Sequence, residues 1–141
     1  MALAPGLMAS LRIVVADVDT AAAMGSGDVP VLATPRMLAL AEAASMAAIT
    51  PSLEPGMTSV GTWVAMEHKR ASPIGAEVEV EAELTEVEGR RLVFKFIARQ
   101  MRPDGAPDGE DAVVGAGTVE RVLVDRDRFV SHARLADTGR A

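Results

Sequence analysis

Two periodicities run along the chain, and each predicts a different kind of element. Apolar residues alternate with glutamates in AEVEVEAELTEVE, residues 76–88, which is the period-two pattern of a strand with one buried face. Strand-like stretches also cover residues 57–72, 91–101 and 112–127, and a shorter alternation, LRIVVADVD, covers 11–19. The pattern therefore predicts five strands, of which the last four follow one another without an intervening helix.

One segment has the period of a helix. Residues 35–49 are rich in Ala, Leu and Met, with Thr34 placed as the N-cap and Pro35 at the first helical position. TPSLEPG, residues 50–56, ends this helix, and the glycines of residues 20–30 predict a loop before it. The order strand, loop, helix and four strands predicts an α+β fold, in which a five-stranded antiparallel sheet wraps around one long central helix.

Composition narrows the classes of protein to which the chain can belong. The 141 residues predict a single domain, 1–141, with poorly ordered segments at 1–10 and 130–141. A net charge of -6 argues against nucleic acid as a partner, and two histidines without ligand spacing and no cysteine give no metal site. Without a signal peptide or a stretch of ~20 apolar residues, we expect a cytoplasmic protein with no membrane partner.

An aliphatic surplus points to self-association. Hydrophobic residues make up 49% of the chain, whereas aromatic residues make up only 3%. Since one helix covers only one face of a five-stranded sheet, the remaining apolar surface favours a homodimer.

Glu42 is the one carboxylate inside the predicted helix. It lies beside the apolar stripe rather than opposite it, which places it at the border of the buried face. The stripe consists of Met37, Leu38, Ala41, Ala44, Ser45 and Ala48. From spacing alone, Glu42 is either a solvated residue at the flank of the helix or part of a site.

Four separate motifs occur in an order and at a spacing that resemble a known family. They are VLATPRMLALAEAA, LEPGMTSVGTWVAMEHKRASPIG, VEGRRL and GAGTVERVLV. Together they resemble the hotdog-fold thioesterases, most closely the group of fluoroacetyl-CoA thioesterases, over residues 31–130. The resemblance implies a hotdog fold and hydrolysis of a small acyl-CoA to the free acid and CoA, without a cofactor.

The resemblance also implies roles for five residues. The catalytic set falls on Thr34, Glu42 and His68, while Gly61 and Arg121 fall on positions that contact the acyl-CoA substrate. Glu42 would serve as a general base or as a nucleophile, and His68 would pair with Glu42 or donate to the oxyanion. Because Pro35 removes one backbone N–H at the start of the helix, the N–H of Gly61 is the candidate oxyanion donor.

Each of these residues also has a purely structural interpretation. Thr34 fits a plain helix cap, and the helical rise places Glu42 about 12 Å further along the axis, too far for a direct hydrogen bond. His68 could lie on the surface, and Gly61 could mark a β-bulge. Arg121 could form an ion pair instead of contacting the substrate.

Two features bear on substrate and on the alternatives. The loop at residues 20–33 should cover the acyl group, and it contains no aromatic residue where the resemblance implies phenylalanines that discriminate fluorine; we therefore expect an enzyme that is not fluoroacetyl-specific. Lys69, Arg70, Arg90 and Arg91 could meet the phosphates of CoA or could simply be solvated. The alternative function is a non-catalytic hotdog protein that binds acyl-CoA or lipid.

Overall fold

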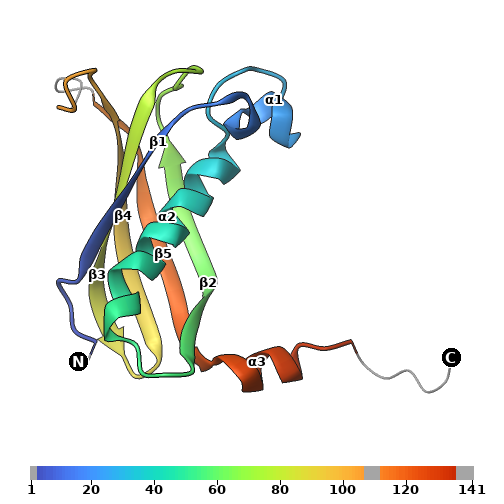
Figure 1. Ribbon diagram of the computed structural model, residues 1–141, viewed down its shortest axis with the longest axis vertical. Coiled ribbons are helices and arrows are strands. Elements are labelled where there is room, and N and C mark those ends of the chain that lie inside the picture. The colour runs from blue at the N-terminus through green and yellow to red at the C-terminus, as the bar shows by residue number, and fades with distance from the viewer. Residues whose placement is uncertain (1–2, 107–111, 136–141) are drawn as a thin grey trace, which may run out of the picture.

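Five strands and one long helix form the body of the molecule (Figure 1). The computed structural model describes residues 3–106 and 112–135. The strands are β1 (Met8–Val14), β2 (Met57–His68), β3 (Glu77–Glu88), β4 (Arg91–Met101) and β5 (Val113–Asp125). The helices are α1 (Ala21–Met24), α2 (Thr34–Ile49) and α3 (Arg126–His132), with short 3-10 turns η1 (Asp17–Asp19) and η2 (Thr50–Ser52).

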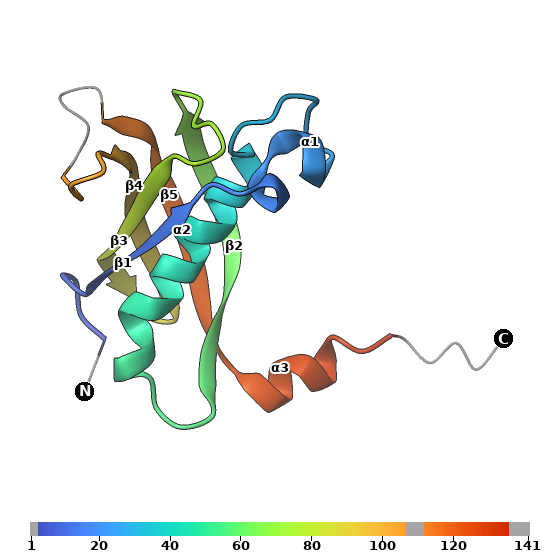
Figure 2. The same cartoon turned by 45° about the horizontal axis from the view of Figure 1, so that its top comes forward.

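The strands form a single antiparallel sheet in the order β1-β3-β4-β5-β2, so β1 and β2 are its two edges. The sheet curves around α2, which crosses its concave face (Figures 1 and 2). This arrangement confirms the predicted hotdog fold. At the bottom of Figure 1, α3 leaves β5 and projects past the β2 edge.

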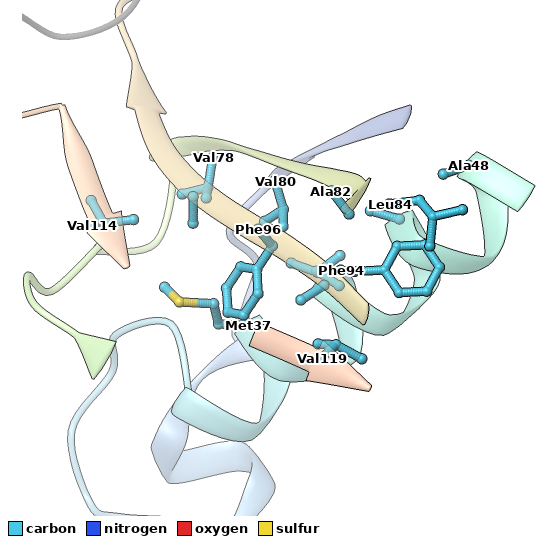
Figure 3. Packing of buried hydrophobic residues seen from close by; sticks show 14 of the residues in the cluster. Met37, Ala48, Val78, Val80, Ala82, Leu84, Phe94, Phe96, Val114 and Val119 are labelled. Carbon is cyan, nitrogen blue, oxygen red and sulfur yellow. The ribbon is translucent and has the colours of Figure 1, made fainter. Parts of the chain in front are cut away.

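The core lies between α2 and the concave face of the sheet. The alternating residues of β3 point toward α2, and Val78, Val80, Ala82 and Leu84 are fully buried. They pack beside the aromatic rings of β4, Phe94 and Phe96, as Figure 3 shows. The glutamates between them face the other side, as the period-two pattern predicts.

The segment between β1 and α2 folds over the N-terminal end of α2 (Figure 2). Two backbone hydrogen bonds fix its return to the helix: Leu32 N donates to Ser72 O at 2.8 Å, and Ala33 N donates to Asp19 O at 2.9 Å. We call residues 20–33 the lid.

Several boundaries differ from the sequence prediction. Strand β1 ends at Val14 instead of residue 19, because the Asp19 side chain accepts a hydrogen bond from Ala16 N and turns the chain out of the sheet. Residues 8–10, expected to be poorly ordered, belong to β1. In the tail, α3 begins before residue 130 and continues to His132, whereas residues 136–141 lie outside the described residues. Among those described, no helix is long and apolar enough to cross a membrane.

The N-terminus of α2 also differs in a way that bears on function. Helix α2 begins at Thr34, its N-cap is Ala33, and no side chain caps the first turn. The prediction that Thr34 is the N-cap is therefore wrong. The Thr34 hydroxyl is free to serve another partner.

Candidate active site

The first polar cluster joins the start of α2 to the end of β2. Thr34 Oγ1 lies 2.8 Å from Nδ1 of His68, within hydrogen-bonding distance. Strand β2 ends at His68, and the backbone of the next residue, Lys69, returns to β5 through a bond from its N–H to Val114 O. The two elements that hold Thr34 and His68 are thus anchored independently.

His68 has one ring nitrogen without a partner. Its Nε2 is buried and makes no hydrogen bond with any residue that the structure describes. Burial lowers the pKa of His68 from its ordinary value of 6.5, and a hydrogen bond with the Arg70 backbone opposes this shift. The imidazole is therefore mainly neutral at pH 7, and it can exchange a proton through either nitrogen.

The second polar cluster centres on a buried guanidinium. Arg121, on β5, is 7% exposed and donates from Nη1 to Glu42 Oε2 at 3.2 Å. Its Nε donates to the Ser59 hydroxyl at 2.7 Å, and its Nη2 donates to Ser59 O at 3.0 Å. Burial lowers the pKa of Arg121, and the Glu42 carboxylate opposes that shift. Arg121 therefore holds one face of a carboxylate that is still 36% exposed on its other side.

Gly61 lies directly beneath the Glu42 carboxylate. A Cβ added at Gly61 would collide with Oε2 of Glu42, the same atom that accepts from Arg121. The missing side chain is what allows β2 to approach this carboxylate so closely. Next to it, the strand register shifts between Gly61 and Trp63, so the interpretation of a β-bulge glycine also holds in part.

The two clusters lie apart within the chain. Thr34 and Glu42 are eight residues apart on one helix, about 12 Å along its axis. On β2, His68 and Gly61 are seven residues apart, roughly 23 Å of extended chain. The expected pairing of His68 with Glu42 is absent among the described residues: His68 pairs with Thr34, and Glu42 pairs with Arg121.

A cavity of about 350 Å³ opens beside the first cluster, between the lid and the end of β2. Thr34 and His68 line it together with Asp28 and Val31 of the lid and Arg70. At the base of the lid, the Arg36 guanidinium donates to the 6% exposed Asp19 at 2.8 Å. This ion pair fixes the lid to the first turn of α2, next to Thr34.

The structure adds residues that the sequence did not reveal. Ser59 supports Arg121, and the only signal for it is its position two residues before Gly61 on the same face of β2. The sequence gives no sign that Asp19 and Arg36 form an ion pair, because they are 17 residues apart and single charged residues at the ends of elements are common. Arg121 itself contacts Glu42 and Ser59, so it forms an ion pair within the chain, and its predicted contact with substrate stays a prediction.

Comparisons with known proteins agree with this arrangement. A family model described as fluoroacetyl-CoA-specific thioesterase matches residues 15–127. The fluoroacetyl-CoA thioesterase of Streptantibioticus cattleyicolor is 40% identical over 104 residues, which are 74% of this chain and 68% of that protein.

Solved structures lead to the same group. A threonine-to-serine variant of the fluoroacetyl-CoA thioesterase in complex with acetyl-CoA has a TM-score of 0.81 at 33% identity, covering 94% of this chain and 97% of that chain. A thioesterase superfamily member from Thermus thermophilus has a TM-score of 0.78 at 27% identity, over 92% of this chain and 89% of that chain.

These matches correct the expectation that the enzyme is not fluoroacetyl-specific. That inference is wrong because the matched family and the 40% identical relative are named for this substrate. A phenylalanine-to-alanine variant of the fluoroacetyl-CoA-specific thioesterase has been solved with fluoroacetate and CoA bound, so that protein still binds both ligands after losing a ring. Because the family model spans most of the chain, from the end of β1 to the start of α3, the protein belongs to the fluoroacetyl-CoA-specific thioesterase family, whose reaction is acyl-CoA thioester hydrolysis.

Proposed function

We propose that the protein is a homodimeric hydrolase of short acyl-CoA thioesters, with fluoroacetyl-CoA as the first substrate to test. The observation that carries the catalytic assignment is the Thr34 hydroxyl, which bonds to His68 instead of capping its helix. A hydroxyl and a neutral imidazole at this distance can relay a proton. The half-exposed carboxylate of Glu42 supplies the complementary basic group.

In this proposal, Glu42 either activates water for attack on the thioester carbonyl or attacks the carbonyl itself to form a mixed anhydride, which water then hydrolyses to the free acid. In both routes the C–S bond breaks and CoA leaves as the thiolate. Arg121 fixes the orientation of the carboxylate through Oε2, which leaves Oε1 to face the substrate. Because Gly61 has no side chain, the backbone of β2 stays close to the Glu42 carboxylate, and the thioester carbonyl would approach that carboxylate from its exposed side. Thr34 and His68 donate a proton to the developing oxyanion or orient the water.

The separation of the two clusters argues that a catalytic site uses residues from two subunits. Among the strands that the structure describes, β2 pairs with β5 alone, so its other edge presents unpaired backbone groups. Five consecutive residues of β2, from Gly61 to Ala65, are exposed, including Trp63 at 53%. Antiparallel pairing of two β2 strands would continue the sheet and would bring His68 of the partner subunit toward Gly61 and Glu42.

Mixing two inactive variants tests this assembly. Glu42→Gln and His68→Gln should each be nearly inactive alone. After the two are unfolded together and refolded, half of the dimers contain one of each, and one of the two sites in such a dimer has both native residues. The mixture should therefore recover about a quarter of wild-type turnover. If all three catalytic residues act within one subunit, no activity returns.

The substrate is tested by measuring CoA release from fluoroacetyl, acetyl, propionyl and butyryl thioesters. We expect turnover of at least one of these short thioesters, and abolition of that turnover in Glu42→Gln. Tight binding of acyl-CoA without any CoA release by the wild-type protein would instead support the non-catalytic alternative. Light scattering on the same samples should give the mass of a dimer, and a concentration-independent monomer mass would remove the proposed assembly.

A further inference from the structure

A second cavity, of about 380 Å³, lies at the opposite end of β2 from the Thr34–His68 pair. Its lining residues come from helix α3, the β3–β4 hairpin, the start of β2 and the end of β5. These elements meet at the bottom of Figure 1. The cavity is lined by Met57, Arg90, Val124, Asp125, Arg128, Phe129 and His132. We call it the α3 cavity.

The chemistry of the α3 cavity is unusual for this chain. The protein carries a net charge of -6, yet two arginines and a histidine line this cavity against one carboxylate. That carboxylate, Asp125, accepts a hydrogen bond from Arg128 N at 3.0 Å and so caps α3. The cavity therefore has a net positive lining, which suits an anionic ligand.

The arginines of the cavity are not engaged by protein carboxylates. Neither Arg90 nor Arg128 makes a side-chain hydrogen bond or an ion pair with another residue in the described part of the chain. By contrast, Arg91, the neighbour of Arg90, is bound to Glu120 at 3.0 Å. Guanidinium groups that face a cavity without a counter-charge are available for phosphate.

The cavity also contains a rare aromatic ring. The chain has only four aromatic residues, and Phe94 and Phe96 are buried in the core. Trp63 lies on the β2 edge, which leaves Phe129, 41% exposed, as the ring in the α3 cavity. A ring beside cationic side chains is the combination that binds a purine nucleotide by stacking and by phosphate contacts.

The position of the cavity matches the length of the substrate. Met57, on the cavity wall, is four residues from Gly61 on β2, about 13 Å of extended strand. The phosphopantetheine arm of CoA joins the thioester to the nucleotide and is long enough to span this separation. A thioester placed over Gly61 would thus direct its nucleotide toward α3.

We propose that the α3 cavity binds the 3′-phosphorylated adenosine diphosphate end of the acyl-CoA, with Arg90 and Arg128 on the phosphates and Phe129 against the adenine. This inference rests on the proposed thioester hydrolysis and extends it to the part of the substrate that does not react. Binding energy from that part lowers KM without any role in bond breaking.

Two substrates that differ only in the nucleotide test the proposal. Arg128→Ala and Arg90→Ala should each raise KM for acyl-CoA about tenfold or more, as expected for losing a charge-assisted phosphate contact, and leave kcat close to wild type. For the same acyl group on pantetheine, which has no nucleotide, both variants should match the wild type. Arg102→Ala, which removes a charge bound to Asp104 at the other end of the sheet, is the matched control and should alter neither substrate.

A binding measurement gives a second readout that is independent of turnover. Adenosine 3′,5′-bisphosphate should bind the wild-type protein by calorimetry, more weakly in Arg128→Ala, and with an affinity that falls as salt is raised. Unchanged KM for acyl-CoA and unchanged bisphosphate affinity in both arginine variants would overturn the inference while leaving the proposed hydrolysis intact. Failure of the wild type to hydrolyse either thioester would instead reject the proposed function.

Discussion

The Arg121–Glu42 cluster and the Thr34–His68 cluster differ in how many of their hydrogen-bonding groups have a partner within the chain. Around Arg121, each of the three guanidinium nitrogens donates to a partner, and the group is almost fully buried. Around Thr34 there is one hydrogen bond, the residue is exposed, and His68 Nε2 has no partner among the described residues. The first cluster is preorganised by contacts within the chain, whereas the second leaves a hydrogen-bonding position open for a substrate, a water molecule or another group.

This difference fits the two contributions that the proposed catalysis needs, a carboxylate held in one orientation and a group that transfers a proton. A buried arginine can hold a carboxylate in one orientation because its own desolvation is compensated by several hydrogen bonds. A hydroxyl–imidazole pair that must transfer a proton requires an unsatisfied position where substrate or water can bind. In the proposed mechanism, the Arg121 cluster would therefore fix where Glu42 acts, and the Thr34–His68 cluster would transfer the proton.

The largest expected effect comes from the reacting atom of the preorganised cluster. Glu42→Gln keeps the size of the side chain and a hydrogen-bond acceptor for Arg121, but it removes the basic oxygen. Thioester hydrolysis should fall by about two to four orders of magnitude, while circular dichroism shows a folded protein. Turnover close to wild type would exclude Glu42 as base or nucleophile.

The next largest effect tests the orientation of Glu42 alone, because the variant keeps the carboxylate and changes only its position. Gly61→Ala adds a Cβ that collides with Oε2 of Glu42 and pushes it away from Arg121. We expect kcat to fall by about a hundredfold, the loss that a displacement near 1 Å produces, with a smaller change in melting temperature. Wild-type kcat in Gly61→Ala would show that the position of Glu42 is not critical.

The fold could be predicted from the sequence more completely than the site. The alternation at 76–88 identifies β3 because every second residue is buried against one helix, so local pattern and tertiary burial agree. The end of β1 could not be predicted, since residues 15–19 continue the apolar alternation while the Asp19 side chain turns the backbone away. Boundaries set by one side-chain hydrogen bond leave no periodic signal.

Within the site, the family resemblance identified the candidate residues, whereas only the structure shows which of them are hydrogen-bonded to each other. Thr34 has the sequence context of a helix cap, and only the position of His68, 34 residues later, shows that its hydroxyl is used elsewhere. Arg121 and Glu42 are 79 residues apart, and no local pattern predicts such a pair. Ser59 was missed for the same reason, because a serine on a strand has no distinguishing spacing.

Thr34 allows the open cluster to be tested against its structural alternative. Thr34→Val retains the shape of the side chain and removes the hydroxyl, so kcat should fall by about ten- to a hundredfold, while Thr34→Ser should restore most of it. The free energy of unfolding should change little, because the Thr34 hydroxyl caps no backbone N–H. A loss of about 1 kcal/mol in chemical denaturation with kcat intact would be the signature of a helix cap instead.

The smallest expected effect is the pH dependence of stability that His68 contributes. Because burial lowers the pKa of His68 in the folded state, the unfolded chain binds the proton more readily. The contribution is therefore fully present above the unfolded-state value near 6.5, and it is lost progressively as the pH falls below 6.5 toward the lower folded-state pKa. Urea denaturation between pH 7.5 and about 5 should show this decline in wild type and a shallower one in His68→Gln. If stability depends on pH with the same slope in His68→Gln as in wild type, His68 takes up a proton as readily in the folded protein as in the unfolded chain. That result would contradict the burial of its imidazole, on which the comparison of the two clusters depends.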